Sequence, residues 1–330
     1  MKSNKLIFLL IIALAALLPV AISNSYAVNI MVLVVTYCTL SSAWNILSGF
    51  AGQFGFSGVF FALGAYVCGG LYSTYGVNPW IGMLIAGCVT AVLGLCIGFI
   101  TFPLRKTYYA LGTLALMFIL QLIFTQNKVI FGINFKGTAG LHLKWIGGLG
   151  NMQFQDNRGY YYIMLAILIL TLVFTSYLIK SKTGFYFKAI NTNQMAACSL
   201  GVNVLKYKQY AQIITALIMG IVGGVYMMFI SSIEPISMFS FDIVFNIMLF
   251  AFVGGRATLF GPTVGAVIMM PLYSLLRYWF STTLPGLPMA IFGLILLLST
   301  QFMPQGIIPL IAEKSRIRKT KAMKAADFGS

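Results

Sequence analysis

Hydrophobic residues of this chain gather in ten long runs, separated by glycine-rich, polar or basic stretches. A membrane-spanning helix needs about 20 mostly apolar residues, and these runs come close to that length. The short run at 241–253 favours a broken or re-entrant helix, which is tolerated where protein or a cavity surrounds it. The pattern predicts an all-α polytopic membrane protein with about ten transmembrane helices. The runs are residues 6–22, 28–47, 57–75, 80–101, 108–126, 160–179, 209–230, 241–253, 262–280 and 287–302.

The composition supports a membrane protein and excludes several soluble classes. Hydrophobic residues make up 60% of the 330 residues, and charged residues only 8%. A typical soluble domain is about 25% charged, so this chain has too few charges to cover a soluble globule of its size. A soluble enzyme, a nucleic-acid-binding protein and a disordered tail are therefore excluded, despite the formal net charge of +16.

The basic residues predict the orientation. If the N-terminus is cytoplasmic and the runs alternate, 16 of the 21 Lys and Arg residues lie inside. This asymmetry favours ten spans with both termini cytoplasmic. The chain then divides into a first transmembrane segment and outer loop (1–27), a transmembrane domain (28–310) and a basic cytoplasmic tail (311–330) that lies against lipid headgroups. The first segment also resembles a signal peptide, because Lys2 and Lys5 precede its apolar run.

Residues for intramembrane chemistry are scarce. The chain has one histidine, His142, and five acidic residues, and its five cysteines show no metal-ligand spacing. No Gly-x4-Gly-Lys-Ser/Thr phosphate loop and no His-Glu-x-x-His metal motif is present. We therefore expect no catalytic residue, metal or cofactor site in this chain, and an intramembrane enzyme is disfavoured.

Two long loops connect the runs. The loop at 180–208, expected inside, predicts a short helix over 193–200, with Thr192 as its N-cap and Gly201 as its left-handed stop. Such a slim, capped helix suits insertion into a groove of another protein. The alternative is a helix on the membrane surface, which its weak apolar face disfavours. The loop at 127–159, expected outside, is either a plain surface loop or a lip for an external partner.

Polar residues and glycines mark the remaining candidates. Uncharged polar residues within or beside spans can bond neighbouring helices or line a path for a neutral or zwitterionic solute. Glycine clusters at 49–58 and 254–265, and small-residue pairs such as Gly220/Gly224, permit close helix packing. Clusters beside broken spans also mark transport pathways, so both interpretations stay open. The candidate path residues include two acids expected at the outer end of the eighth run; they are Asn45, Gln53, Tyr66, Glu234, Asp242 and Asn246.

The inner loop carries a resemblance to a known family. In order along the chain stand Gly184, Ala189-Ile190, Asn193-Gln194, Ala196-Ala197, Leu200-Gly201-Val202-Asn203 and Lys208. This order resembles the coupling segment of permease subunits of ATP-binding-cassette importers for branched-chain amino acids, the LivM-type branch. Supporting matches include Gly64-Ala65-Tyr66, Gly254-Gly255 with Gly261-Pro262, and Pro304-Gln305-Gly306. The resemblance extends over residues 28–309.

The resemblance implies a function and a set of partners. The chain would be the permease subunit of an ATP-driven, binding-protein-dependent importer in a bacterial inner membrane. Its partners would be a paralogous permease, two cytoplasmic ATPases that bind the ATP, and an extracytoplasmic solute-binding protein. The residues expected to couple to the ATPases are Gly184, Ala189, Ile190, Asn193, Gln194, Ala196, Ala197, Leu200 and Gly201.

This chain departs from the family pattern where the family has Arg-Glu-x-Glu. The corresponding positions are the neutral Asn191, Thr192 and Gln194. The solute therefore stays open between branched-chain amino acids, other amino acids, urea and amides. An ion-coupled secondary transporter is a further alternative, for which Asp242 is the candidate ionisable group.

Overall fold

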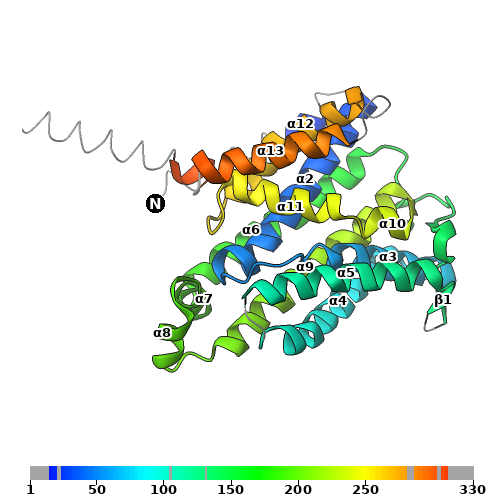
Figure 1. Ribbon diagram of the computed structural model, residues 1–330. Coiled ribbons are helices and arrows are strands. Elements are labelled where there is room, and N and C mark those ends of the chain that lie inside the picture. The colour runs from blue at the N-terminus through cyan, green and yellow to red at the C-terminus, as the bar shows by residue number, and fades with distance from the viewer. Residues whose placement is uncertain are drawn as a thin grey trace, which may run out of the picture.

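The computed structural model describes residues 15–20, 24–103, 106–130, 132–280, 286–302 and 306–310. This part of the chain is a bundle of helices with short strands at one end (Figure 1). The main helices are α2 (Ser25–Asn45), α3 (Val59–Tyr75), α4 (Pro79–Thr101), α5 (Lys106–Gln126), α6 (Arg158–Lys180), α9 (Val204–Ile230), α11 (Phe241–Gly254), α12 (Gly261–Phe280) and α13 (Leu287–Phe302). Shorter helical elements are η1 (Ile46–Phe50), η2 (Gly137–Ala139), η3 (Leu149–Asn151), α7 (Lys182–Thr192), α8 (Gln194–Ser199) and α10 (Pro235–Met238).

Six described helical segments are long and apolar enough to cross a membrane. They are Ser25–Phe50, Pro79–Thr101, Tyr108–Gln126, Arg158–Lys180, Val204–Ile230 and Pro235–Gly254. Val59–Tyr75 and Leu287–Ser299 are apolar but shorter. The helical membrane character is thus confirmed, whereas the count of ten spans and the sides of the termini stay predictions. Most of the first predicted run (6–22), and all of the tail at 311–330, lie outside the described residues.

Local sequence signals set many helix ends. Asn24 and Asn78 cap α2 and α4 by accepting from the backbone N–H of Tyr26 (2.9 Å) and Trp80 (3.0 Å). Helix α3 stops at Gly76, whose φ of 65° lies in the left-handed region. The eighth predicted run (241–253) is not broken as expected: it forms the continuous helix α11, and the interruption falls before it, between α10 and α11.

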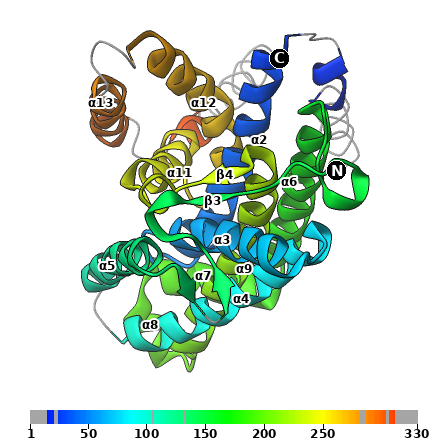
Figure 2. The same cartoon turned by 90° about the vertical axis from the view of Figure 1, so that its right-hand side faces the viewer.

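Small residues let the central helices touch backbone to backbone. A Cβ atom on Gly64 of α3 would lie 2.5 Å from the Cα of Gly220 on α9. On the other side of α9, the Thr90 hydroxyl of α4 donates to the Ala216 carbonyl at 2.9 Å. Helix α9 is therefore held between α3 and α4, and α2 packs against α6, α11 and α12. Figure 2 shows α3, α4, α5 and α9 in one group and α11, α12 and α13 in another.

The predicted outer loop (127–159) is partly ordered into strands. Strand β1 (Val129–Ile130) pairs with β2 (Ile133–Asn134), and β3 (Leu141–His142) pairs with β4 (Ser232–Ile233), both antiparallel. His142 is exposed, and its ring nitrogens contact the Ser232 hydroxyl (2.6 Å) and the Ala139 carbonyl (3.0 Å). The β3–β4 pairing ties this loop to the α9–α10 connection. We call this the strand end; α7 and α8 lie at the opposite end, the α8 end (Figure 1).

Candidate functional site

The span that begins with α2 does not continue as a regular helix. Its last turn is the π-helix η1, after which residues 51–58 are non-helical until α3 begins. We call 51–58 the unwound segment; it runs between α5 and α11 (Figure 1). The Phe56 N–H donates to the hydroxyl of Thr113, which lies inside the Tyr108–Gln126 span, at 2.9 Å. The Gly55 carbonyl accepts from the Trp44 indole at 2.9 Å. The unwound segment therefore follows one candidate span and packs against another, with side chains supplying partners to part of its backbone.

The unwound segment has two faces. Gln53, Gly55 and Ser57 are buried, whereas Phe54 and Phe56 are partly exposed. The Phe54 ring lies 6.2 Å from that of Phe252 on α11. The Phe56 ring lies 5.9 Å from that of Phe241 at the start of α11. With Phe245, which stacks on Phe241 at 5.7 Å, these rings form a continuous surface that we call the aromatic strip. It consists of Phe54, Phe56, Phe241, Phe245 and Phe252.

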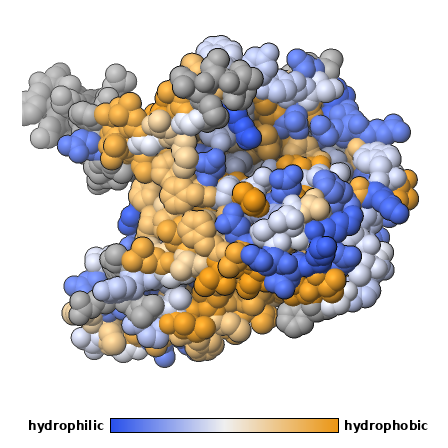
Figure 3. All heavy atoms as spheres, turned by 45° about the vertical axis from the view of Figure 1, so that its right-hand side comes forward, coloured by the Kyte–Doolittle hydropathy of each residue, from blue (hydrophilic) through white to orange (hydrophobic). Residues whose placement is uncertain are grey.

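Hydrophobic and polar surfaces are separated on the molecule. Figure 3 shows a broad hydrophobic region over the body of the bundle and hydrophilic side chains gathered toward the strand end. A face with irregular backbone differs from an ordinary lipid-facing surface, because hydrocarbon offers no hydrogen bonds to unwound peptide groups. The face that carries the unwound segment therefore needs a cover of protein or a water-lined path.

Behind the aromatic strip lies a group of buried polar side chains. The two amide atoms of Gln53 have no hydrogen-bond partner among the described residues. Nearby, the Tyr109 hydroxyl donates to the Gln212 Oε1 at 2.5 Å, while the Gln212 Nε2 lacks a described partner. A buried polar group without a partner costs about 1–3 kcal/mol. Such groups are typically satisfied by bound water or ligand, or serve a function.

The six predicted path residues do not form one site. Asn45 is buried, and both of its amide atoms bond the backbone of the α11–α12 connection: Nδ2 donates to the Thr258 carbonyl and Oδ1 accepts from the Ala257 N–H, each at 2.8 Å. Asn246 is buried on α11. Asn45 and Gln53 thus lie around η1 and the unwound segment, Asn246 lies within α11, and the other three candidates lie toward the strand end.

At the strand end, Tyr66 is buried in an aromatic cluster. Its ring lies 4.7 Å from Phe124 and is stacked on Phe239 at 5.8 Å, and its hydroxyl lacks a described partner. Glu234 and Asp242 are exposed in the α9–α11 region. Both therefore lie on the surface of the bundle and away from its interior.

The predicted inner loop (180–208) is more ordered than expected. It contains two helices, because α7 precedes the expected short helix α8. Gly184 allows α7 to fold back on α6, since a Cβ there would lie 2.6 Å from the Ile179 Cα. The predicted N-cap Thr192 is wrong: its hydroxyl donates to the Lys188 carbonyl at 2.9 Å, within α7. Asn193 caps α8 instead, by accepting from the N–H groups of residues 195 and 196 at 3.0 and 3.1 Å.

The end of α8 follows the prediction. Gly201 has a φ of 82°, and its N–H donates to the Cys198 carbonyl at 2.9 Å. The Val202 N–H donates to the Ala197 carbonyl at 3.1 Å, which completes a Schellman motif. Ordered caps at both ends make α8 a rigid projection of the chain.

The predicted coupling residues divide between a buried and an exposed side. Gly184, Ile190 and Ala197 are buried and hold the helix pair together. Gln194 accepts from the nearly buried Lys208 Nζ at 3.0 Å, which joins α8 to α9. The other predicted residues are exposed; they are Ala189, Asn193, Ala196, Leu200 and Gly201. Met195, which sequence reasoning missed, is 83% exposed, and Leu200 at the other end of α8 is 84% exposed. Two large apolar side chains projecting from a polar loop were a signal that could have found it.

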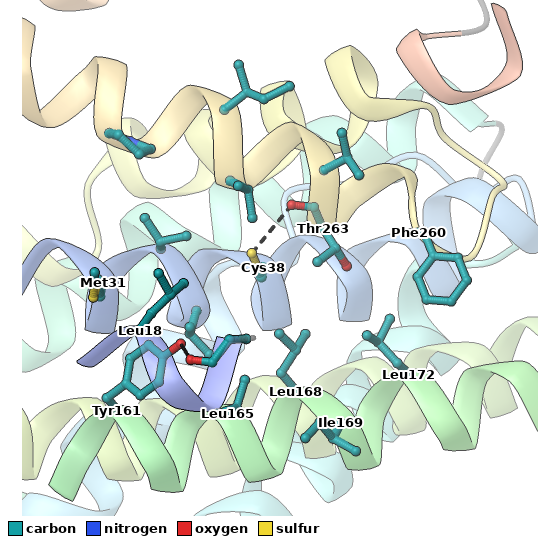
Figure 4. A pocket seen from close by; sticks show the side chains of 17 residues that line it. Leu18, Met31, Cys38, Tyr161, Leu165, Leu168, Ile169, Leu172, Phe260 and Thr263 are labelled. Carbon is teal, nitrogen blue, oxygen red and sulfur yellow. Dashed lines mark hydrogen bonds between the residues drawn. The ribbon is translucent and has the colours of Figure 1, made fainter. Parts of the chain in front are cut away.

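A separate cavity lies between α2, α6, α12 and residues 15–20 (Figure 4). Its volume is about 750 Å³, and its lining is almost entirely apolar, with Met31 and Leu168 among the wall residues. The Cys38 thiol donates to the Thr263 carbonyl at 3.5 Å across one wall. The described lining offers no charged group for the ends of a zwitterion. The unwound segment, with polar groups behind apolar rings, is the better candidate site.

A helical membrane domain with an interrupted span and a capped helix pair at one end has the architecture of a membrane transport permease. The comparison with known families agrees. The family described as the branched-chain amino acid transport system permease component matches residues 26–300, and the chain belongs to this family. The family resemblance is thereby confirmed, whereas the coupling role of the inner loop stays a prediction.

Curated relatives carry related descriptions. The high-affinity branched-chain amino acid transport system permease protein LivM of Escherichia coli is 25% identical over 340 residues, covering 97% of this chain and 78% of the relative. LivM of Salmonella typhimurium is 24% identical with the same coverage. A probable branched-chain amino acid transport permease protein LivH of Methanocaldococcus jannaschii is 24% identical, covering 84% of this chain and 88% of the relative. No solved structure matches this chain.

Proposed function

We propose that this chain is the permease subunit of an ATP-driven, binding-protein-dependent importer for branched-chain or related hydrophobic amino acids. The observation that carries the proposal is the unwound segment, packed against the candidate span Tyr108–Gln126, with the aromatic strip on its open face. Apolar rings suit the side chain of such a solute, and the polar groups near Gln53 suit its zwitterionic end. The descriptions of the LivM relatives support the same solute class.

The translocation path runs along the aromatic strip, between this chain and a paralogous permease subunit. A second permease provides the protein cover that non-helical backbone requires in a membrane. Glu234 and Asp242, exposed toward the strand end, are placed to meet the ammonium group of an entering solute. Tyr66, Asn45 and Asn246 are buried and act by shaping the walls of the path.

Motion reaches the path from the α8 end. Under this proposal the α8 end is cytoplasmic, and α8 inserts into a groove of an ATPase through Met195, Leu200 and the small Ala196. The strand end faces outward and receives the solute-binding protein. Two partner ATPases bind the ATP. Two permease subunits enclose the path, and the complex lies in a bacterial inner membrane.

The test is uptake by the assembled transporter, co-expressed with its neighbouring reading frames and reconstituted into liposomes. Radiolabelled leucine, another amino acid class and urea are compared, with and without enclosed ATP. We expect ATP-dependent uptake of leucine only. Uptake of urea without leucine would overturn the solute assignment, and uptake that needs an ion gradient and no ATP would favour the secondary-transporter alternative.

Phe56→Ala tests the path itself. It removes two ring contacts in the strip, each worth about 0.5–1.5 kcal/mol, so leucine uptake should fall by about fivefold or more. Phe118→Ala is the matched control, because Phe118 is also an exposed ring but lies on α5 outside the strip. Equal effects of the two substitutions would contradict the placement of the path.

A further inference from the structure

One side chain joins the helix pair of the α8 end directly to the interrupted span. Asn191, in the last turn of α7, donates through its Nδ2 to the carbonyl of Gly49 in η1 at 2.8 Å. The two residues are 142 positions apart in the sequence. The last carbonyls of a helix lack intrahelical partners, so the place where η1 gives way to non-helical chain is suited to accept an amide donor.

The contact leaves little room for movement of either partner. Gly52, in the unwound segment, has a φ of 69°, and a Cβ there would lie 2.9 Å from the Asn191 Cγ and 3.0 Å from its Cα. Only glycine adopts this backbone conformation readily and also admits the neighbouring helix. Asn191 is therefore seated between Gly49 and Gly52, with a hydrogen bond on one side and van der Waals contact on the other.

The chain of contacts continues beyond Gly49. A Cβ on Gly49 would lie 2.8 Å from the Ala257 nitrogen and 2.7 Å from the Asn45 Cγ. Asn45 in turn bonds the backbone of Ala257 and Thr258, in the connection that comes after α11. Close contacts thus lead from α7 through η1 to α11, which carries three rings of the aromatic strip.

We propose that Asn191 is a positioning residue that latches the α7–α8 pair to η1, so that displacement of α8 moves the unwound segment and α11 together. The inference rests on the proposed function and deepens it, because it names the route from coupling helix to path. The latch needs an amide donor. An aspartate has the same shape, but it would place a carboxylate oxygen against the Gly49 carbonyl, and two acceptors cannot form the hydrogen bond.

The experiment compares Asn191→Ala and Asn191→Asp with the matched control Thr192→Ala in the reconstituted transporter. Thr192 is the next residue, is exposed, and its hydroxyl bonds the Lys188 carbonyl within α7. The first readout is amide hydrogen exchange of peptides covering residues 49–58, with α9 peptides reporting global folding. The second is the ratio of ATP hydrolysed to solute transported.

We expect both Asn191 variants to raise exchange in 49–58 and the ATP-to-solute ratio by about fivefold, the population change that accompanies loss of one buried hydrogen bond. Exchange in α9 and both readouts of Thr192→Ala should match the wild type. Wild-type values in Asn191→Asp would overturn the latch. Faster exchange with an unchanged ATP-to-solute ratio would show that Asn191 only holds residues 49–58 in place. That result would also overturn its role in transmitting motion from α8.

Failure of the proposed function looks different. If the wild-type protein transports without ATP, the importer assignment fails, and with it the coupling role of Asn191. The exchange comparison then still decides whether Asn191 holds the unwound segment.

Discussion

Gly201 offers a test in which backbone conformation alone changes. It ends α8 with a φ of 82°, and a Cβ built on it would meet nothing within 4 Å. A substitution there therefore causes no clash, and its cost comes from the left-handed backbone, about 1–2 kcal/mol for an ordinary L-residue. Such a cost multiplies the population of an opened helix end by about 5- to 30-fold.

The Gly201 substitutions should rank by how well each new residue tolerates the left-handed conformation, and not by the volume of its side chain. Gly201→Asn should lie near the wild type, Gly201→Ala should be intermediate and Gly201→Val should be the most damaging, because β-branching adds strain. The assay is hydrogen exchange across residues 193–203 together with the ATP-to-solute ratio. We expect both to rise in that order, because a frayed α8 absorbs the ATPase motion before it reaches the path.

Gly76 provides the matched control. It ends α3 at the strand end with a φ of 65°, and it too has nothing within 4 Å of a built Cβ. Gly76→Ala should cost similar stability and leave the ATP-to-solute ratio unchanged. An unchanged ratio in Gly201→Val, or an equal change in Gly76→Ala, would refute the argument that α8 must stay rigid.

Other surfaces of the same structure can be tested in the same way. Replacing both Met195 and Leu200 by serine should lower co-purification of the ATPases at least tenfold while the permease pair stays intact; retained ATPases would place the docking surface elsewhere. Cys198, exposed on α8, should react with an impermeant maleimide only in inverted vesicles, whereas a cysteine in place of Leu149 should react only in intact cells; reversed accessibility would invert the topology. Gly64→Ala should push α3 away from the α9 backbone and lower the melting temperature by several degrees. An unchanged melting temperature would show that α3 and α9 can move apart without cost.

The sequence predicted those parts of the α8 end that depend only on residues adjacent in the chain. Glycine after a short helix identified Gly201, and the helix itself lies within one residue of its expected bounds. The N-cap was assigned one residue too early because Thr192 and Asn193 are both good capping residues. Only the surrounding fold shows that α7 extends through Thr192 and uses its hydroxyl.

Features that join distant segments were not predictable in this way. The Asn191–Gly49 contact and the β3–β4 pairing depend on chain segments that meet only after folding, and two-residue strands have no periodic pattern to detect. The aromatic strip was hidden because the chain has 27 phenylalanines, which occur in most of its apolar runs and its loops. The sequence Phe54-Gly55-Phe56 was the one local trace of it, within the glycine cluster that was already noted at 49–58.

The π-helical turn η1 also bears on how this protein tolerates changes in length. Such a turn holds one residue more than an α-helical turn, and each residue of an α-helix rotates the next by about 100° around the helix axis. Deleting one residue within Ile46–Phe50 would restore regular winding and swing the Gly49 carbonyl toward another side of the span. Single-residue deletions and insertions would therefore expose the importance of this turn, whereas a survey limited to substitutions would understate it.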